Sequence, residues 1–248
     1  MQEYNKTKTA LITGGAKRIG REIALYLAKN GYNIVISYNN SSKDAEKLAI
    51  EVENLFQKKC HTYKCDLCDI RQTQKLANYM ASNFLDWNLL INNASIFEQN
   101  SFIQDDFLTK FEKNQNIHLT SPIILGQTFA KQIASRKTID AQIINMVDKN
   151  ITRFDSKYFY YTLSKKSLAN LTQMLALELS PNIRSNAIAP GIILPPIDNH
   201  PYSHKNNPLQ YEASPVNIVQ AVNYLLTNKF VNGEILYVDG GSNLNNQG

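Results

Sequence analysis

The sequence lacks any long apolar run and has few cysteines. No stretch approaches the roughly 18 to 20 apolar residues that a membrane-spanning helix requires, and no secretory leader is apparent. Only three cysteines occur in 248 residues, and such an odd count is typical of reduced thiols. We therefore expect a cytoplasmic protein without a disulfide and without a membrane partner.

Charge of one sign is not concentrated anywhere in the chain. Lysine and arginine exceed aspartate and glutamate by 26 to 21, which gives a net charge of +5. This excess is small and scattered, and it includes neither a basic tract nor a known nucleic-acid-binding motif. We expect no nucleic-acid partner, although the excess suits small anionic ligands.

The candidate metal ligands are few. Cys60, His61, Cys65 and Cys68 are close in sequence, which is compatible with zinc. However, residues 60 to 65 read as a strand, and successive side chains of a strand point to opposite faces. We therefore expect no metal site.

Length and composition suit one α/β domain over residues 1–248, because 43% of the residues are hydrophobic and can form an adequate core. Apolar patterning predicts an alternation of strands and helices, which is typical of a doubly wound parallel sheet of about seven strands with helices on both faces. The expected strands lie near 8–13, 33–38, 60–65, 88–92, 141–147, 183–188 and 234–238. The expected helices lie near 18–30, 42–58, 71–84, 105–135, 157–180 and 215–228.

A glycine turn joins the first expected strand to the first helix. Gly14, Gly15 and Gly20 follow the apolar run that ends at Thr13. Glycines let the backbone approach a pyrophosphate, and the amides at a helix start favour negative charge. Gly14 and Gly20 are six residues apart, so the usual three-glycine dinucleotide motif fits imperfectly.

A second motif lies in the helix near 157–180. Tyr161 and Lys165 are four residues apart, so they share one helix face. A free tyrosine titrates near pH ~10, and a nearby ammonium can lower that pKa toward the working range of a catalytic acid. Alone, such a spacing is more often a solvated pair than a catalytic one.

Together these motifs resemble the short-chain dehydrogenase/reductase family. The spacing of Gly14 and Gly20 matches that family, and the remaining segments follow in its order: Asp66-Leu67, Asn92-Asn93-Ala94-Ser95, Tyr161 with Lys165, Pro190-Gly191, Gly233 and Tyr237-Val238-Asp239-Gly240-Gly241. The resemblance covers nearly the whole chain. It implies a single-domain Rossmann-type fold that binds a nicotinamide dinucleotide. The implied cofactor residues are Gly14, Lys17, Arg18, Ile19, Gly20, Tyr38, Asn39, Asn40, Ser41, Asp66, Leu67, Asn93, Ala94, Ser95, Met146, Tyr161, Lys165, Pro190, Gly191 and Ile193.

The end of the second strand favours NADP over NAD. A carboxylate there would bind the ribose 2′-hydroxyl and repel a 2′-phosphate, but residues 37 to 42 are all neutral. Lys17 and Arg18 stand in the neighbouring glycine turn, where cations are disfavoured unless a ligand phosphate compensates them. We therefore predict NADPH as the cofactor.

Several residues resemble the pteridine reductase and dihydromonapterin reductase branch of the family. Asp148 stands where most relatives carry a serine, and a carboxyl group suits proton delivery to a ring nitrogen. Phe97 matches the phenylalanine that stacks a pterin, with Arg18 and Ser95 beside it. The resemblance implies that Asp148, Tyr161 and Lys165 are catalytic and that Arg18, Ser95, Phe97, Asp148 and Tyr161 bind a pterin or folate substrate. The alternatives are that Asp148 is a surface loop carboxylate and that Phe97 packs on the core.

Three features leave alternatives open. His118 occupies the place of an asparagine that many relatives use to position the lysine, so it is either a relay substitute or a core histidine. A substrate loop at about 192–213 has contacts that the sequence does not reveal. Leu168, Leu171, Leu175 and Leu179 form an apolar pattern that permits the homotetramer common in the family, or else an ordinary core face.

Three functions are compatible with these residues. The first is an NADPH-dependent reductase of a dihydromonapterin, dihydropteridine or dihydrofolate type of substrate. The second is a general carbonyl reductase, such as a 3-oxoacyl-carrier-protein reductase, in which Asp148 is incidental. The third is a non-catalytic NADP-binding sensor, against which the intact Tyr161 and Lys165 argue.

Overall fold

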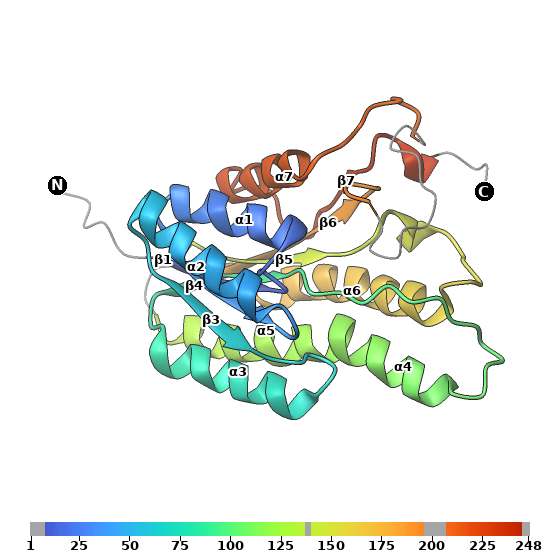
Figure 1. The fold of residues 1–248 in the computed structure, drawn as a ribbon, viewed down its shortest axis with the longest axis horizontal. Helices are drawn as coiled ribbons and strands as arrows, with labels where there is room; N and C mark the ends of the chain where they lie inside the picture. Colours follow the sequence, from blue (N-terminus) through green and yellow to red (C-terminus); the bar gives the residue numbers. More distant parts are fainter. Residues whose placement is uncertain (1–7, 137–139, 196–206, 245–248) are drawn as a thin grey trace.

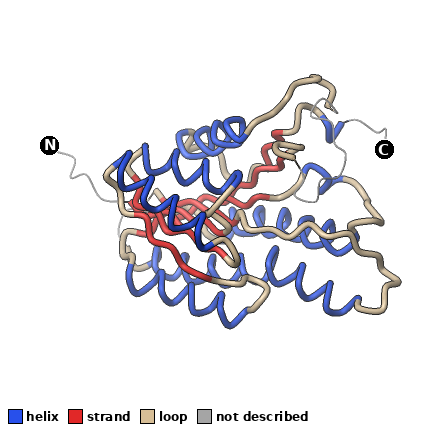
Figure 2. The backbone as a smooth tube through the Cα atoms, viewed as in Figure 1, coloured by secondary structure: helices blue, strands red, loops and turns tan. Residues whose placement is uncertain are grey.

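The computed structural model describes residues 8–136, 140–195 and 207–244, in which seven parallel strands form one sheet (Figures 1 and 2). The order across the sheet is β3-β2-β1-β4-β5-β6-β7. The strands are β1 (Lys8–Thr13), β2 (Tyr32–Tyr38), β3 (Cys60–Lys64), β4 (Trp87–Asn92), β5 (Ala141–Met146), β6 (Ile183–Pro190) and β7 (Ile235–Val238). The predicted doubly wound parallel sheet is thereby confirmed.

Helices cover both faces of the sheet. One layer contains α1 (Arg18–Lys29), α2 (Ser42–Phe56) and α7 (Pro215–Thr227), and the other contains α3 (Ile70–Asn83), α4 (Phe107–Gln115), α5 (Ser121–Ala134) and α6 (Phe159–Glu178) (Figure 1). Two short 3-10 helices, η2 (Lys149–Thr152) and η3 (Ser242–Leu244), follow β5 and β7.

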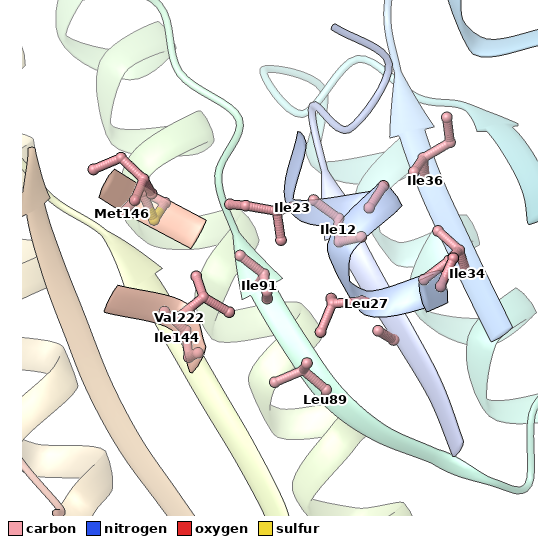
Figure 3. Close-up of a cluster of buried hydrophobic side chains, with 14 of the residues drawn as sticks. Ile12, Ile23, Leu27, Ile34, Ile36, Leu89, Ile91, Ile144, Met146 and Val222 are labelled. Carbon is pink, nitrogen blue, oxygen red and sulfur yellow. The ribbon is translucent and has the colours of Figure 1, made fainter. Parts of the chain in front are cut away.

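The apolar core divides between these two layers. Beneath α1, α2 and α7, a cluster of buried aliphatic side chains includes Ile23 and Leu27 of α1 and Val222 of α7, packed on Ile34 of β2 and Ile91 of β4 (Figure 3). A second cluster on the opposite face includes the fully buried Trp87 and Phe129, whose ring centroids are 4.8 Å apart. Parallel strands covered on both faces read as near-continuous apolar runs, which is why their positions could be predicted.

The order of the strands changes direction between β1 and β4. The chain runs outward from β1 through β2 to β3, and then returns so that β4 pairs with the other edge of β1. At such a switch point the loops after the two strands diverge and leave a crevice at their carboxyl ends. The glycine turn after β1 and the segment from Asn93 to Phe97 after β4 meet there.

The helix predicted near 105–135 is interrupted. A five-residue π-helical segment, η1 (Asn116–Thr120), lies between α4 and α5 and contains His118.

The leucines of the apolar pattern along α6 pack against the core. Leu168 is buried, and Leu171, Leu175 and Leu179 are partly buried and packed against the apolar clusters. The four leucines therefore form an ordinary core face and supply no evidence for a subunit interface.

Within the part of the chain that the structure describes, no helix combines the length and apolar character needed to span a membrane.

Candidate active site

The glycine turn is tied directly to the end of β4. Gly14 has φ +62°, a left-handed conformation that favours glycine, and a Cβ on Gly20 would approach the Gly14 carbonyl oxygen to 2.5 Å. The hydroxyl of Thr13 accepts hydrogen bonds from the backbone amides of Asn93 and Ala94, at 2.9 and 3.0 Å. The Asn93 side chain donates to the carbonyls of Thr13 and Gly14. The two loops at the switch point are thus held close together.

A cleft of about 660 Å³ opens above this turn. Most of the predicted cofactor residues line it: Gly14, Lys17, Arg18, Ile19, Gly20, Tyr38, Asn39, Asn40, Ser41, Asp66, Leu67, Asn93, Ala94 and Ser95. The remaining ones, Met146, Tyr161, Lys165, Pro190, Gly191 and Ile193, do not line it. Gly191 and Ile193 instead border a second cavity of about 360 Å³ beside β7.

Some residues of the cleft were not anticipated. Glu98 lies in the loop after β4, and its carboxylate pairs with the ammonium groups of Lys110 and Lys113 of α4 at 3.3 and 3.2 Å. Glu98 and Lys113 both line the cleft, together with Ala16, Ser37, Cys65, Cys68, Ile96 and Ile117. The two cysteines flank the predicted Asp66-Leu67 and could have been added on that ground. Lys113 joins the cleft only through tertiary packing, so no local signal identifies it.

The residues of the cleft fit a dinucleotide. A Cβ on Gly14 would approach the Cα of Ala94 to 2.9 Å, so only glycine lets the turn after β1 pack this closely against the segment after β4. Lys17 precedes α1 and is exposed, and the first turn of that helix contains no acidic residue. The guanidinium of Arg18 donates a 2.8 Å hydrogen bond to the carbonyl of Pro195. This contact ties the glycine turn to the start of the predicted substrate loop, of which residues 196–206 lie outside the described residues.

Asp148 and Tyr161 contact one another directly. The phenol of Tyr161 donates a 2.8 Å hydrogen bond to the carboxylate of Asp148, although the residues lie on different elements. Asp148 follows β5 and caps η2, where its other oxygen accepts the amide of Asn150 at 2.8 Å. Its carboxylate therefore faces Tyr161, unlike a surface loop carboxylate.

Burial dominates the protonation of this pair. Loss of solvent raises the pKa of Asp148, and hydrogen bonds from Asn150 and Tyr161 only partly offset that effect. The pKa of Tyr161 is raised well above 10, first by burial and then by the neighbouring Asp148 carboxylate. The pair thus retains its phenolic proton, which Asp148 accepts in a hydrogen bond.

Lys165 acts differently from our prediction. Its ammonium donates a 2.7 Å hydrogen bond to the carbonyl of Met146 and lies 5.8 Å from the ring centroid of Tyr161. Burial lowers the pKa of Lys165 to about 8, although Asp148 opposes that shift. The predicted lowering of the Tyr161 pKa by Lys165 is not seen: burial and then Asp148 raise that pKa.

An aromatic wall stands beside Tyr161. Phe97 is 59% exposed, so the alternative that it packs into the core is wrong. Its ring stacks on Tyr158, with centroids 4.2 Å apart and planes 12° apart, and meets Tyr161 edge-on at 4.8 Å. Tyr158 was not anticipated; its position three residues before Tyr161 is the only signal that could have suggested it.

His118 lies behind the same tyrosine. It is 1% exposed and contacts the hydroxyls of Ser95 and Ser164 at 2.8 and 2.9 Å. It is therefore a buried histidine that also reaches a residue of the cleft. Among the described residues, no group of three or more histidine, cysteine, aspartate or glutamate side chains could hold a metal ion.

Comparison with known proteins agrees with this geometry. The model of the enoyl-(acyl carrier protein) reductase family matches residues 14–243. L-rhamnose 1-dehydrogenase (NADP(+)) of Thermoplasma acidophilum is 29% identical, with 98% of each chain covered, and dihydromonapterin reductase of Enterobacter sp. (strain 638) is 26% identical over 95% of this chain and 96% of that protein. The crystal structure of FolM alternative dihydrofolate reductase 1 from Brucella canis, complexed with NADP, superposes with a TM-score of 0.87 at 30% identity, covering 97% of this chain and 96% of that one. The chain belongs to the short-chain dehydrogenase/reductase family of oxidoreductases.

Proposed function

We propose that this chain is an NADPH-dependent reductase of a pterin or folate, and that Tyr161 and Asp148 deliver the proton to the reduced ring. The observation that carries the proposal is the 2.8 Å hydrogen bond from the Tyr161 phenol to the Asp148 carboxylate. A ketone reductase needs a donor to an oxygen. Reduction of a C=N bond instead requires a proton on nitrogen, for which a paired carboxyl and phenol are suited.

The cofactor is NADP. The FolM structure contains NADP, and the Thermoplasma relative is named for NADP(+). In this chain, the neutral Tyr38, Asn39 and Asn40 at the end of β2 line the cleft, and Lys17 lines it too. An ammonium group without a competing carboxylate favours a 2′-phosphate.

The surroundings of Tyr161 support a flat heterocyclic substrate. One face of the Phe97 ring stacks on Tyr158, and the exposure of Phe97 leaves aromatic surface for a ligand. A planar ring held by an aromatic face loses little further freedom, which favours a reactive orientation. Arg18 and Ser95 both line the cleft and supply polar contacts at its edge.

The chain's residues divide the proton chemistry between them. When bound, the nicotinamide supplies a hydride to the carbon of the substrate's C=N bond. The phenol of Tyr161 gives its proton to the adjacent nitrogen, and the Asp148 carboxyl accepts a replacement proton from solvent and passes it to the phenolate. The Lys165 ammonium, held by the Met146 carbonyl, lies close enough to stabilise the negative charge while it resides on Tyr161.

NADPH oxidation tests the proposal. We expect turnover with dihydropterins or dihydrofolate, and little with acetoacetyl thioesters. Tyr161→Phe should lower kcat by roughly a hundredfold or more, because general acid catalysis contributes about 10²- to 10⁴-fold, with little change in NADPH affinity. The control is Tyr160→Phe, which removes the neighbouring phenol that reaches only the Phe102 carbonyl, at 3.4 Å. Unchanged turnover in Tyr161→Phe would refute its role.

A carbonyl reductase is the second candidate, since the sugar dehydrogenase of Thermoplasma is 29% identical to this chain. It predicts ketone turnover and a mild effect of Asp148→Ser. NADPH binding without oxidation of either substrate class would instead indicate a sensor.

A further inference from the structure

His118 makes hydrogen bonds through both ring nitrogens, and its partners lie on two different segments of the candidate site. It lies in η1, and its Nδ1 is 2.9 Å from the Ser164 hydroxyl of α6. Its Nε2 is 2.8 Å from the Ser95 hydroxyl and 3.4 Å from the amide nitrogen of Ile96, both in the loop after β4. The ring therefore connects the catalytic helix to the loop that leads to Phe97.

The hydrogen-bond partners determine where the ring carries its proton. The Ser164 hydroxyl donates its one proton to the Tyr161 carbonyl at 2.8 Å, so Ser164 must accept from Nδ1. On the other side, the Ile96 amide can only donate, so Nε2 must be an acceptor. Both constraints give a neutral imidazole with its proton on Nδ1. Burial, and then the nearby Lys165, lower the pKa of His118 well below its ordinary value, in agreement with this form.

The unprotonated Nε2 of His118 orients the hydroxyl of Ser95, which could otherwise rotate. Ser95 is exposed at the edge of the cleft, where water would compete for its hydroxyl. With Nε2 as acceptor, the hydroxyl proton of Ser95 points inward to His118, and its oxygen lone pairs remain available to the cleft. Ser95 also lies close to the Tyr161 phenol.

We infer that His118 is a positioning residue for the reaction: its unprotonated Nε2 holds the Ser95 hydroxyl and the loop from Ser95 to Phe97 in place beside Tyr161. The inference rests on the proposed function only for the choice of substrate. One consequence is that Ser95 presents an acceptor to the cleft, so the ligand atom beside it is a hydrogen-bond donor such as a ring or amino N–H.

Kinetics of variants test the role of His118. His118→Phe keeps a buried ring and removes the acceptor, so kcat/KM should fall roughly tenfold, the effect expected for loss of one net hydrogen bond of about 1.4 kcal/mol. In His118→Gln the amide oxygen can accept from Ser95 and should restore part of the loss. Thr172→Val is the control, because it also removes a buried hydrogen-bonding group. The Thr172 hydroxyl lies on α6 and contacts Asn145 at 2.9 Å, not His118.

A double-mutant cycle separates positioning from general destabilisation. If His118 acts through Ser95, the variant with both His118→Phe and Ser95→Ala should be no slower than the slower single variant. Losses that multiply would overturn the inference. The cycle uses whichever compound the wild type reduces, a dihydropterin or a ketone, so failure of the proposed substrate class does not affect it.

Nitrogen NMR of the imidazole provides a readout that needs no turnover. The ring of His118, assigned by its loss in His118→Gln, should show a protonated Nδ1 and an unprotonated Nε2 near neutral pH. A proton on Nε2, or a doubly protonated ring, would overturn the inference even if the enzyme reduces pterins.

Discussion

Asp148 and Tyr161 gain their chemical character from their surroundings as well as from their side chains. Asp148 follows β5. The Asn150 amide donates to one oxygen of its carboxylate, and the other oxygen accepts from the Tyr161 phenol. Tyr161 is only 6% exposed, and burial also raises the pKa of Asp148. Water therefore stabilises a negative charge poorly on either the phenol or the carboxyl group. Because burial opposes a charge on the phenol, Tyr161 keeps its proton, hydrogen-bonded to Asp148, and can release it in the proposed reaction.

The raised pKa of Asp148 predicts a pH dependence of stability. Because burial raises this pKa in the folded chain, the folded state binds a proton over a range where the unfolded state has released it. The contribution to the free energy of unfolding is complete below the ordinary carboxyl pKa of about 3.9 and is lost as the pH rises through the folded value. Asp148→Asn stays neutral, so its Tm relative to wild type should increase between pH 4 and pH 7 in calorimetric scans.

A difference in Tm that decreases over this range would show that the folded pKa of Asp148 is not raised. Asn can still accept from Tyr161, so the change tests charge with little loss of geometry. The same variant should reduce pterin turnover, since it can no longer carry a proton to Tyr161.

The sequence identified these residues more easily than it described their protonation. The spacing of Tyr161 and Lys165 and the position of Asp148 are visible in the chain itself. The direction in which the pKa of Tyr161 shifts is not visible in the sequence, because it depends on how completely the fold removes water from the phenol. Likewise, the exposure of Phe97 and the stack on Tyr158 result from how the loop after β4 meets the start of α6.

At the scale of elements, strands were predicted within one or two residues because buried parallel strands have a strong apolar signal. The segment from 105 to 135 was predicted less well. Its helical periodicity runs through α4, η1 and α5, but the π segment brings His118 to Ser95 and Ser164, which are distant in sequence. Interruptions of this kind are frequent at functional sites and have no clear local signature.

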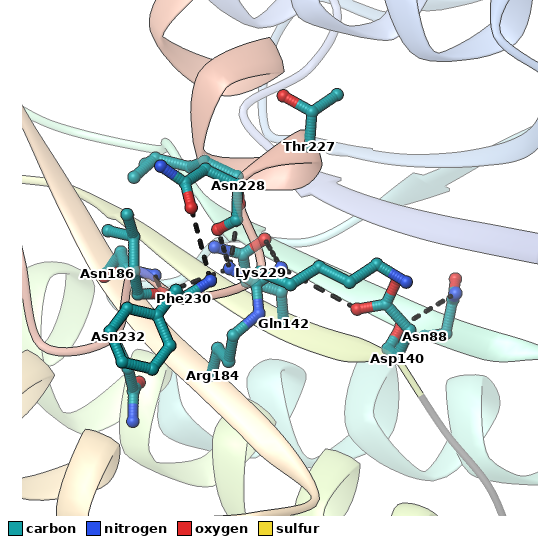
Figure 4. Close-up of polar contacts among 12 residues, drawn as sticks. Asn88, Asp140, Gln142, Arg184, Asn186, Thr227, Asn228, Lys229, Phe230 and Asn232 are labelled. Carbon is teal, nitrogen blue, oxygen red and sulfur yellow. Dashed lines mark hydrogen bonds and ion pairs between the residues drawn. The ribbon is translucent and has the colours of Figure 1, made fainter.

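Arg184 of β6 provides an anchor for the end of α7. Its guanidinium donates to the carbonyls of Leu225, Asn228 and Val231 and to the side chain of Gln142, and it pairs with Asp140 at 3.7 Å (Figure 4). The Arg184 side chain is only 13% exposed, so these hydrogen bonds form largely shielded from water at its guanidinium. No sequence pattern indicated this role.

Replacing Arg184 with Met should therefore destabilise the fold. We expect the free energy of unfolding to fall by roughly 3 kcal/mol, because several acceptors lose a largely buried charged donor. Urea denaturation measures this change. The matched control is Lys229→Ala: Lys229 pairs with the same Asp140 at 3.3 Å, but its side chain is 72% exposed, so its loss should cost less than about 1 kcal/mol. Equal effects of the two variants would contradict the anchoring role.

At the scale of the whole molecule, the sheet brings together loops that are far apart in sequence. The glycine turn after β1, the end of β2 and the loop after β4 line one cleft because β1 and β4 are neighbours at the switch point. This arrangement followed from the predicted alternation of strands and helices. The extent of the domain, the assembly into a homotetramer and the cytoplasmic location stay predictions.

Cofactor choice should be measurable as stability of the whole fold. A ligand that binds only the folded state adds about 2.7 kcal/mol to the free energy of unfolding at 100 times its Kd, which corresponds to several degrees in Tm. NADPH should therefore raise the Tm more than NADH at equal concentration. Lys17→Ala should shrink this difference, whereas Lys29→Ala, at the far end of the same helix, should not. Asn39→Asp should favour NADH by repelling the 2′-phosphate; equal shifts with both cofactors in the wild type would contradict the assignment of the phosphate to Lys17 and the end of β2.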